Sequence, residues 1–411
     1  MSSNRPSTSA GGFGSLLDRI SAECKSQGLW TEDMHKDLPK KWEKHGNMIL
    51  LPENCFTLPQ WRLLGGAHWR IVAEAFQVTR VGRKRRISPD DYRTPHVELL
   101  YGQDGWVEHV DNKIRYQYDV TKCMFSVGNI TEKLRIASFC CKGEVVVDMF
   151  AGIGYFTLPY LVHAQADHVY AIDWNPDALA ALKRNLELNH VTGRCTVIEG
   201  DCRKVCPTFL ADRVNLGLLP TSRHYWLIGA KALKPSGGIL HIHDTLTSSK
   251  FTSKQQNNAT TNDNHRHQSK PAAETNGLAD QDAATTCQNN VDSDLVIANG
   301  TSDASGTTVE RVKPSRAASI VLEMEAAELE QEPIIEEQYA MEAWPKLDAE
   351  WRAYALKTAA KMTGFLNNLH EQLQWRCRIL GVVKVKGYAP HIDHVVLDLE
   401  CRPIGKGSQK S

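Results

Sequence analysis

The residues with the clearest chemical use lie in a glycine-rich turn within the run Glu144 to Leu158, EVVVDMFAGIGYFTL. The apolar residues around Asp148 predict a strand that is covered on both faces. Gly152 and Gly154 allow the backbone to pass close to a ligand, and the helix that follows presents its free N–H groups there. A tight turn between strand and helix explains the same glycines, so this run needs support from residues further along the chain.

Two acidic residues provide that support, because each ends or follows a strand in the same series. Asp173 closes HVYAID and is placed to accept hydrogen bonds from ribose hydroxyls, while Asp201 follows the next strand, within reach of an adenine amine. Helix capping would explain either acid as well. A dinucleotide site needs a third glycine near Thr157, and the chain has none there. The pattern therefore predicts a ligand with adenosine and no pyrophosphate, and S-adenosyl-L-methionine is such a ligand.

Strand and helix patterns alternate through the middle of the chain, which predicts a doubly wound α/β sheet with right-handed crossovers. The expected elements are strands at 144–149, 168–173, 195–199, 213–219 and 238–243, with helices after Gly154, from Pro176 and near 225–233. A long amphipathic helix over 345–373 comes later, followed by strands at 376–387 and 394–400. The short connection YAPHI requires these two strands to pair antiparallel. A parallel sheet with an antiparallel last strand is the Rossmann-like architecture of class I methyltransferases.

Composition divides the chain into four segments. We expect residues 1–105 to form a smaller N-terminal α+β domain that positions a nucleic acid, and 106–246 and 339–404 to form the two parts of the sheet domain. Residues 247–338 are rich in Ser, Thr, Asn, Gln, Asp and Glu, which predicts a disordered low-complexity insert. The net charge of zero conceals an asymmetry. Between Thr247 and Glu342 there are 16 acidic residues against 7 basic ones, which leaves 41 basic against 32 acidic residues elsewhere. This basic surplus suits a polyanionic partner.

The densest basic run is RVGRKRR, Arg80 to Arg86, for which a solvated loop and a contact to an RNA backbone are both open interpretations. No stretch approaches the roughly 18 apolar residues that a membrane helix needs. The eleven cysteines are scattered without a CxxC pair, which indicates reduced thiols rather than a disulfide framework or a zinc site. We therefore expect a cytoplasmic monomer without a membrane span or a bound metal.

The strand from Arg213 ends in NLGLLPTS. Many methyltransferases that act on exocyclic base amines carry an Asp/Asn-Pro-Pro-aromatic motif at this place. Here Asn215 is separated from Pro220 by four residues, and no aromatic residue follows directly. Methylation of an exocyclic amine is therefore disfavoured.

Several motifs resemble one family specifically: FSVGNITEKLRIA from Phe125, VVVDMFAGIGYFTLPYLVHA, IDWNP, GDCR and VNLGLLPTS. They are similar to the family that contains tRNA wybutosine-synthesizing protein 2 and the tRNA (guanine-37-N1)-methyltransferases. The resemblance runs through about 106–244 and resumes at the YAPH-containing tail. It implies a cofactor held by Ser126, Lys133, Asp173, Asp201 and Cys202, beside the Asp148, Gly152 and Gly154 of the glycine turn.

The same resemblance implies transfer of a 3-amino-3-carboxypropyl group from S-adenosyl-L-methionine to 4-demethylwyosine at position 37 of phenylalanine tRNA, with the anticodon stem-loop as partner. Lys133 would engage the carboxylate of the cofactor. No general base is evident, and Asn215, Pro220 and Tyr388 are candidates for the substrate pocket. Two alternatives stay open: a methyltransferase acting on guanine-37 N1, and a non-catalytic RNA-binding protein that retains a vestigial cofactor pocket.

Overall fold

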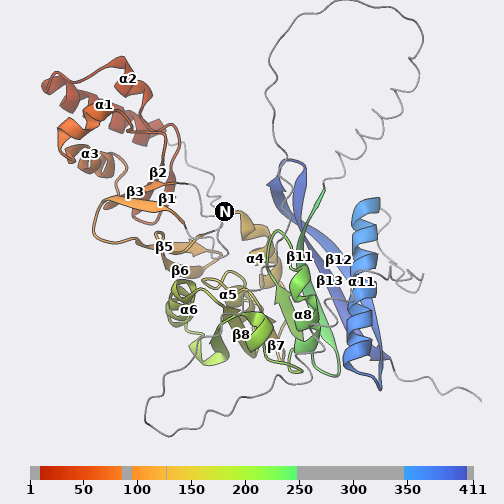
Figure 1. The fold of residues 1–411 in the computed structure, drawn as a ribbon. Helices are drawn as coiled ribbons and strands as arrows, with labels where there is room; N and C mark the ends of the chain where they lie inside the picture. Colours follow the sequence, from red (N-terminus) through yellow and green to blue (C-terminus); the bar gives the residue numbers. More distant parts are fainter. Residues whose placement is uncertain (1–9, 86–94, 126, 248–346, 405–411) are drawn as a thin grey trace, which may run out of the picture. The chain divides into compact units, whose positions relative to one another are not determined.

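The computed structural model describes residues 10–85, 95–125, 127–247 and 347–404. In the described residues it contains a four-stranded sheet, a two-stranded hairpin and a seven-stranded sheet (Figure 1). The predicted insert, 247–338, lies outside the described residues except for Thr247. The boundaries proposed for the four segments stay a prediction.

The seven-stranded sheet has the strand order β12-β13-β11-β10-β7-β8-β9. All neighbouring pairs from β11 to β9 are parallel, whereas β13 runs antiparallel to both β11 and β12. The predicted doubly wound sheet with an antiparallel last strand is therefore confirmed. The strands are β7 (Val145–Asp148), β8 (His168–Asp173), β9 (Cys195–Glu199), β10 (Arg213–Leu216), β11 (Gly238–Thr247), β12 (Gln374–Ala389) and β13 (Ile392–Ile404).

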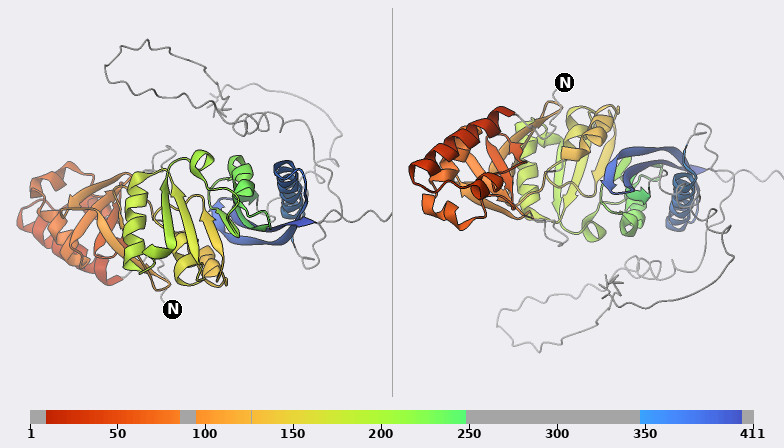
Figure 2. Two further views of the ribbon diagram at one scale, coloured as in Figure 1. Left: turned by 90° about the horizontal axis from the view of Figure 1, so that it is seen from below. Right: turned by 90° about the horizontal axis from the view of Figure 1, so that it is seen from above.

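Helices cover both faces of this sheet, as the two views in Figure 2 show. Successive side chains of β10 point to opposite faces of the sheet. On one face Asn215 donates to Asp148, which also accepts from Thr157 of α5. On the other face Leu216 packs against Gly229 of α8. On the first face α4 contacts α5, and on the second α8 contacts α11. The helices are α4 (Ile130–Ala137), α5 (Thr157–Val162), α6 (Pro176–Leu188), α7 (Cys202–Val205), α8 (Trp226–Ala232) and α11 (Ala349–Leu369), with 3-10 turns η2 (Val127–Asn129), η3 (Thr192–Arg194) and η4 (Arg223–Tyr225).

The structure adjusts several expected boundaries. Strand β10 ends at Leu216 rather than Leu219, and the helix after the glycine turn has only six residues. Strands β12 and β13 are longer than expected, and they stay paired over most of their length across the β-bulges in β12. They are joined at Pro390 and His391, and His391 has a left-handed φ of 63°.

The N-terminal residues form the predicted α+β unit. Its sheet, in the order β1-β2-β3-β4, has one parallel pair, β2 with β3, between two antiparallel ones. A separate hydrophobic cluster includes Leu16, Ile49 and Trp61 from its helices and sheet. The elements are α1 (Ala10–Ser26), α2 (Glu32–Lys36), β1 (Glu43–His45), β2 (Met48–Pro52), η1 (Pro59–Leu64), α3 (Ala67–Ala75), β3 (Arg80–Lys84) and β4 (Val97–Tyr101).

The hairpin of β5 (Trp106–Asp111) and β6 (Ile114–Asp119) packs against α6. Asn185 of α6 and its C-cap residue Asn189 accept hydrogen bonds from the backbone N–H groups of Gln117 and Arg115 at 2.6 and 3.0 Å. These side chains satisfy backbone donors on the edge of the hairpin, which fixes it on the helix.

Candidate active site

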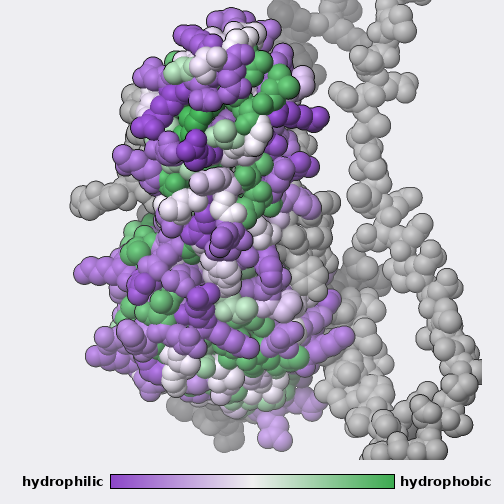
Figure 3. Space-filling view, turned by 90° about the vertical axis from the view of Figure 1, so that its left-hand side faces the viewer, coloured by the Kyte–Doolittle hydropathy of each residue, from purple (hydrophilic) through white to green (hydrophobic). Residues whose placement is uncertain are grey.

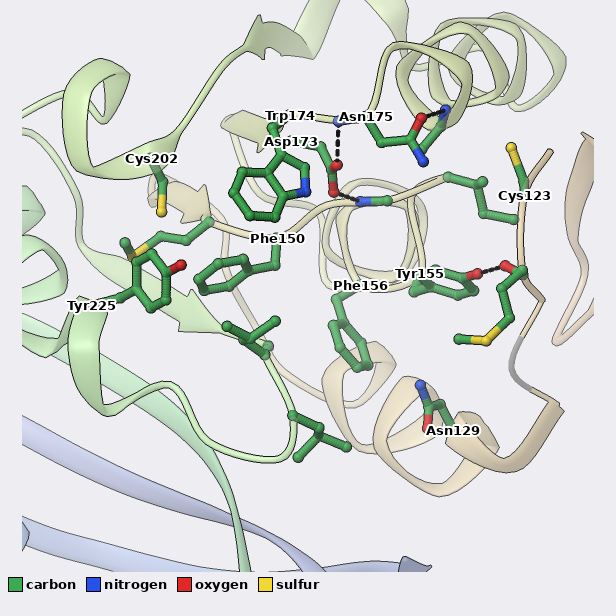
Figure 4. Close-up of a pocket in the computed structure, with 18 of the residues that line it drawn as sticks. Cys123, Asn129, Phe150, Tyr155, Phe156, Asp173, Trp174, Asn175, Cys202 and Tyr225 are labelled. Atoms are coloured by element: carbon green, nitrogen blue, oxygen red, sulfur yellow. Dashed lines mark hydrogen bonds between the residues drawn. The ribbon is translucent and has the colours of Figure 1, made fainter. Parts of the chain in front are cut away.

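A pocket of about 440 Å³ lies at the carboxyl ends of β7, β8, β9 and β10 (Figure 4). In open α/β sheets ligands bind at this edge, outside the carboxyl ends of the strands. The end of β12 and the turn before α4 complete the walls. The lining residues are Cys123, Met124, Asn129, Met149, Phe150, Gly152, Ile153, Tyr155, Phe156, Asp173, Trp174, Asn175, Ala178, Gly200, Asp201, Cys202, Gly217, Leu218, Leu219, Tyr225, Lys386, Gly387 and Tyr388.

The glycine turn forms one wall of the pocket. Gly152 and Gly154 have φ values of 54° and 98°, in the left-handed region that favours glycine. Gly152 lines the pocket, whereas Gly154 packs behind it, where an added Cβ would lie 2.9 Å from Leu182. Gly152 is therefore placed for close approach of a ligand, which stays a prediction, and Gly154 serves close packing.

Asp173, at the end of β8, holds this turn in place. Its Oδ2 accepts a hydrogen bond from the Gly152 N–H at 2.7 Å, and its Oδ1 accepts from the Asn175 N–H at 2.9 Å (Figure 4). Burial raises the pKa of the Asp173 carboxyl, and these backbone donors oppose that shift. Each carboxylate oxygen has a second lone pair, so the side chain can also accept from a ligand hydroxyl.

Asp201 and Cys202 line the pocket next to Gly200, after β9. Asp201 accepts from the Arg203 N–H as the N-cap of α7, and the Arg203 guanidinium lies 2.7 Å from its Oδ2. Hydrogen bonding to Arg203 holds the pKa of Asp201 below its ordinary value. The Cys202 thiol is buried, and its burial raises its pKa. Asp201 thus has the helix-capping role considered from the sequence while it also faces the pocket.

Asp148 and Asn215 lie behind the pocket rather than in its wall. Asp148 is fully buried and accepts from Thr157 Oγ1 at 2.7 Å and from Asn215 Nδ2 at 3.0 Å. Its burial raises its pKa. Asn215 Oδ1 lies 3.2 Å from His243 Nε2, and His243 Nδ1 lies 3.0 Å from His394 Nε2. Because an amide oxygen only accepts, His243 donates from Nε2 and His394 donates to His243 Nδ1.

The other two substrate-pocket candidates are placed differently from each other. Tyr388 lines the pocket and is 42% exposed. Pro220 follows a cis peptide bond after Leu219, and it is the two residues before it, Leu218 and Leu219, that line the pocket. Among these candidates the structure brings Tyr388 to the pocket, and it places Asn215 in the core.

The sequence is similar to those of known proteins. Residues 107–268 match the model of the TRM5/TYW2 methyltransferase domain, and residues 26–105 match that of the TYW2 N-terminal domain. The chain is 42% identical over 391 residues to the tRNA wybutosine-synthesizing protein 2 homolog of Bos taurus, which covers 94% of this chain and 77% of the relative. With the Homo sapiens homolog it shares 42% identity over 390 residues, 94% of this chain and 75% of the relative.

The chain belongs to the tRNA wybutosine-synthesizing protein 2 family. The family suggested by the sequence motifs is therefore confirmed. Its fold also agrees with a crystal structure of Pyrococcus horikoshii TYW2 in complex with MeSAdo. That structure has a TM-score of 0.52 and 24% sequence identity, over 94% of this chain and 98% of the other.

From the resemblance to the tRNA wybutosine-synthesizing protein 2 family we also expected Ser126 and Lys133 to bind the cofactor. Ser126 lies outside the described residues. Lys133 of α4 is 2% exposed, and its Nζ lies 2.5 Å from Asp111 Oδ2 of β5. Its ammonium also lies 5.1 and 4.8 Å from the ring centroids of Tyr116 and Phe125. Lys133 is not among the lining residues of the pocket, so its contact with the cofactor stays a prediction.

Sequence reasoning missed several aromatic and polar residues of the pocket. Trp174 and Asn175 follow Asp173 directly in IDWNP. Their position just after the strand could have indicated that they line the pocket. Phe150 and Tyr225 make an edge-to-face contact with centroids 4.9 Å apart, and they come from different strand ends. Lys386 and Asn129 are also in the pocket wall. No local pattern brings these last two together, because they are far apart in the sequence.

The basic run from Arg80 to Arg86 is described up to Arg85, and its cations there face acidic partners. Arg80 pairs with Asp104, Lys84 with Glu43, and both Arg83 and Arg85 with Glu98. On the face shown in Figure 3, hydrophilic side chains are interspersed with smaller hydrophobic patches. The side chains of Lys84 and Arg85 are exposed, and exposed ion pairs are weak and exchange with other partners, so an RNA-backbone contact of this run stays a prediction.

Within the described residues, no group of three or more His, Cys, Asp or Glu side chains is arranged to hold a metal ion. In the same residues, no helix is both long enough and apolar enough to span a membrane.

Proposed function

We propose that this protein transfers the 3-amino-3-carboxypropyl group of S-adenosyl-L-methionine to a ring carbon of 4-demethylwyosine at position 37 of phenylalanine tRNA. The observation that carries the proposal is the pocket, in a chain that belongs to the tRNA wybutosine-synthesizing protein 2 family. Its volume of about 440 Å³ is in the range of sites that bury a ligand of this size.

The residues of the pocket fit this co-substrate. Asp173 offers carboxylate lone pairs for ribose hydroxyls, beside the Gly152 turn that allows close approach. Asp201 faces the same cavity one strand further along the sheet, where its carboxylate can accept from an adenine amine. The aromatic side chains of Trp174, Phe150 and Tyr225 line the same pocket. These groups recognise adenosine without a pyrophosphate.

The reaction balances without a further co-reactant. The bond between sulfur and the γ-carbon of the aminocarboxypropyl arm breaks, and its electron pair stays on sulfur, which leaves neutral 5′-methylthioadenosine. The acceptor ring carbon forms the new carbon–carbon bond and loses its proton to solvent. Which of the three carbons on sulfur is transferred depends on which one is held in line with the acceptor.

The partner in this proposal is the anticodon stem-loop of the tRNA, bound by a monomeric enzyme in the cytoplasm. The N-terminal α+β unit, which matches the TYW2 N-terminal domain, would position the tRNA. The surplus of 41 basic over 32 acidic residues outside 247–342 supports a polyanionic substrate.

The test uses S-adenosyl-L-methionine labelled in the methyl carbon and, separately, in the carboxyl carbon. Each is incubated with the protein and with tRNA that carries either 4-demethylwyosine or unmodified guanine-37. We expect carboxyl label in the 4-demethylwyosine tRNA and release of methylthioadenosine. Methyl label on guanine-37 would replace the proposal by methyl transfer, and the absence of both labels would favour a binding protein.

A further inference from the structure

Lys386 is a cation at the opposite side of the pocket from the two acids. It lies on β12, at one edge of the sheet, whereas Asp173 ends β8 and Asp201 follows β9 toward the other edge. Among the described lining residues it is the only Lys or Arg. The pocket therefore has hydrogen-bond acceptors for hydroxyls and an amine at one end and a positive charge at the other.

The side chain of Lys386 lies against Gly128 of η2. A Cβ added to Gly128 would lie 2.7 Å from Lys386 Nζ and 3.0 Å from its Cδ, so the glycine leaves the space that the lysine occupies. Contacts between β12 and η2 support the same placement. Gly128 is thereby linked to a lysine more than 250 residues later in the chain.

Asn129, the next residue after Gly128, contributes an acceptor to the same end of the pocket. It lines the pocket on the α4 side (Figure 4), and its Oδ1 is buried. No described residue donates a hydrogen bond to that oxygen. A buried acceptor without a donor costs free energy, which a ligand N–H group would recover.

Lys133 is not among the lining residues at this end of the pocket. Its ammonium is neutralised at 2.5 Å by Asp111. It still acts on Lys386, since burial first and the charge of Lys133 second lower the pKa of Lys386. An anionic ligand group beside Lys386 would relieve both effects.

We propose that Lys386 binds the carboxylate of the aminocarboxypropyl arm and that Asn129 Oδ1 accepts a hydrogen bond from the α-ammonium of that arm. This inference rests on the proposed function, and it names the residues that hold the transferred group. Anchoring both charged ends of the arm fixes the γ-carbon relative to the acceptor base, so these residues contribute to the choice of the arm over the methyl group.

The test compares dissociation constants for three ligands: S-adenosyl-L-methionine, its decarboxylated form, which keeps the amine, and 5′-methylthioadenosine, which lacks the arm. For Lys386→Ala we expect a loss of about 10- to 100-fold for S-adenosyl-L-methionine, the size of a charge-assisted hydrogen bond. The other two ligands should change less than about threefold, the range of a surface substitution. Lys386→Arg should recover part of the loss.

Asn129→Ala should weaken S-adenosyl-L-methionine and its decarboxylated form alike and leave methylthioadenosine unchanged. The matched control is Lys384→Ala. Lys384 lies on the same strand, and its Nζ contacts Asp393 at 2.6 Å outside the pocket lining. We expect this control to change none of the three constants.

Equal losses for all three ligands in Lys386→Ala would show a general structural role and overturn the inference, as would an unchanged constant for S-adenosyl-L-methionine. The proposed function can fail separately from this inference. In that case the wild type would transfer the methyl group, while Lys386→Ala would still lose affinity only for the carboxylate-bearing ligand. The carboxylate contact would then stand, and the proposed reaction would be wrong.

Discussion

The ammonium of Lys133 lies 2.5 Å from the carboxylate of Asp111, and both side chains are largely withdrawn from solvent, with exposed fractions of 2% and 14%. The pair joins α4 to the β5–β6 hairpin and lies against the rings of Tyr116 and Phe125. Burial lowers the pKa of Lys133, and Asp111 opposes that shift by hydrogen bonding to the charged form. Lys133 therefore stabilises the junction between the hairpin and the sheet domain.

The first prediction concerns this pair. Lys133→Ala and Asp111→Ala should each lower the free energy of unfolding by about 3 kcal/mol, because each leaves one largely buried charge without its partner. The double variant Lys133→Met/Asp111→Leu should recover most of that loss. Urea denaturation of the four proteins measures the effect.

The same double variant tests whether Lys133 contacts the cofactor. We expect it to lose less affinity for S-adenosyl-L-methionine than Lys386→Ala does. A loss as large as that of Lys386→Ala would support the assignment of Lys133 that the family resemblance implied.

The second prediction concerns Asp173. Asp173→Ala removes the acceptor of the Gly152 and Asn175 N–H groups, which fix the glycine turn, and it removes the carboxylate that we propose accepts from the ribose. S-adenosyl-L-methionine and methylthioadenosine both carry the ribose, so both should bind about 100-fold more weakly, the cost of two or three lost hydrogen bonds. Isothermal titration calorimetry with both ligands measures this.

A suitable control is Asp167→Ala. Asp167 also accepts a backbone N–H bond, from Gly143 at 3.0 Å, but outside the pocket lining. It should cost some stability and leave both dissociation constants unchanged. Selective loss of one ligand in Asp173→Ala would contradict its assignment to the ribose.

The third prediction is that the free energy of unfolding falls at acidic pH because of His394. Its ring is surrounded by His243 of β11 and Lys386 of β12, and Glu132 of α4 lies 4.0 Å from His243. Burial, and then the charge of Lys386, lower the pKa of His394 from 6.5 to about 4. Between these values the unfolded chain binds a proton that the folded protein excludes, so this stability is fully present above pH 6.5 and is lost as the pH falls toward 4.

This single group should remove about 2 kcal/mol of the free energy of unfolding between pH 7.5 and pH 5. His394→Gln keeps an N–H donor for His243 and cannot titrate, so it should flatten the dependence by that amount. The pKa of His68 in the N-terminal unit is also lowered to about 4, by burial, and His68→Gln should act independently in the same direction. Identical pH profiles for His394→Gln and the wild type would refute the assignment.

The part of the site that the sequence predicted depends on local order along the chain. Gly152, Asp173 and Asp201 lie at or within four residues of the ends of parallel strands, and the carboxyl ends of such strands meet at one edge of a sheet. The sequence also suggested that Asn215 lies near the end of a strand. In the structure it lies within β10 and pairs in register with Asp148 of β7. Strand alternation then turns its side chain into the face under α5, which the motif alone did not indicate.

Lys386 and Lys133 show the opposite case. The position of Lys386 depends on the bulges of β12 and on its pairing with β13, both of which are long-range features. The motif placed Lys133 next to the cofactor, but a contact with Asp111 on a separate hairpin decides where its ammonium lies. Helical spacing within TEKLR contains no information about that hairpin.

The last prediction concerns the segment between the two parts of the sheet domain. Trp351 Nε1 donates a hydrogen bond to the Thr247 carbonyl at 3.1 Å, so the described residues on either side of 248–346 are already joined. Deletion of 251–330 should therefore leave turnover nearly unchanged. Shortening this connection from about 100 to about 20 residues lowers the entropic cost of closing it, which should raise stability by about 1.4 kcal/mol.

The deletion also removes more acidic than basic residues, so it should strengthen tRNA binding at low salt and have less effect at high salt. Turnover, thermal unfolding and tRNA affinity at two salt concentrations measure these effects. A Gly/Ser replacement of the deleted length is the control, because it restores the connection without its charges. If turnover fell sharply in both variants, residues 251–330 would have a direct role in the reaction and the prediction would be wrong.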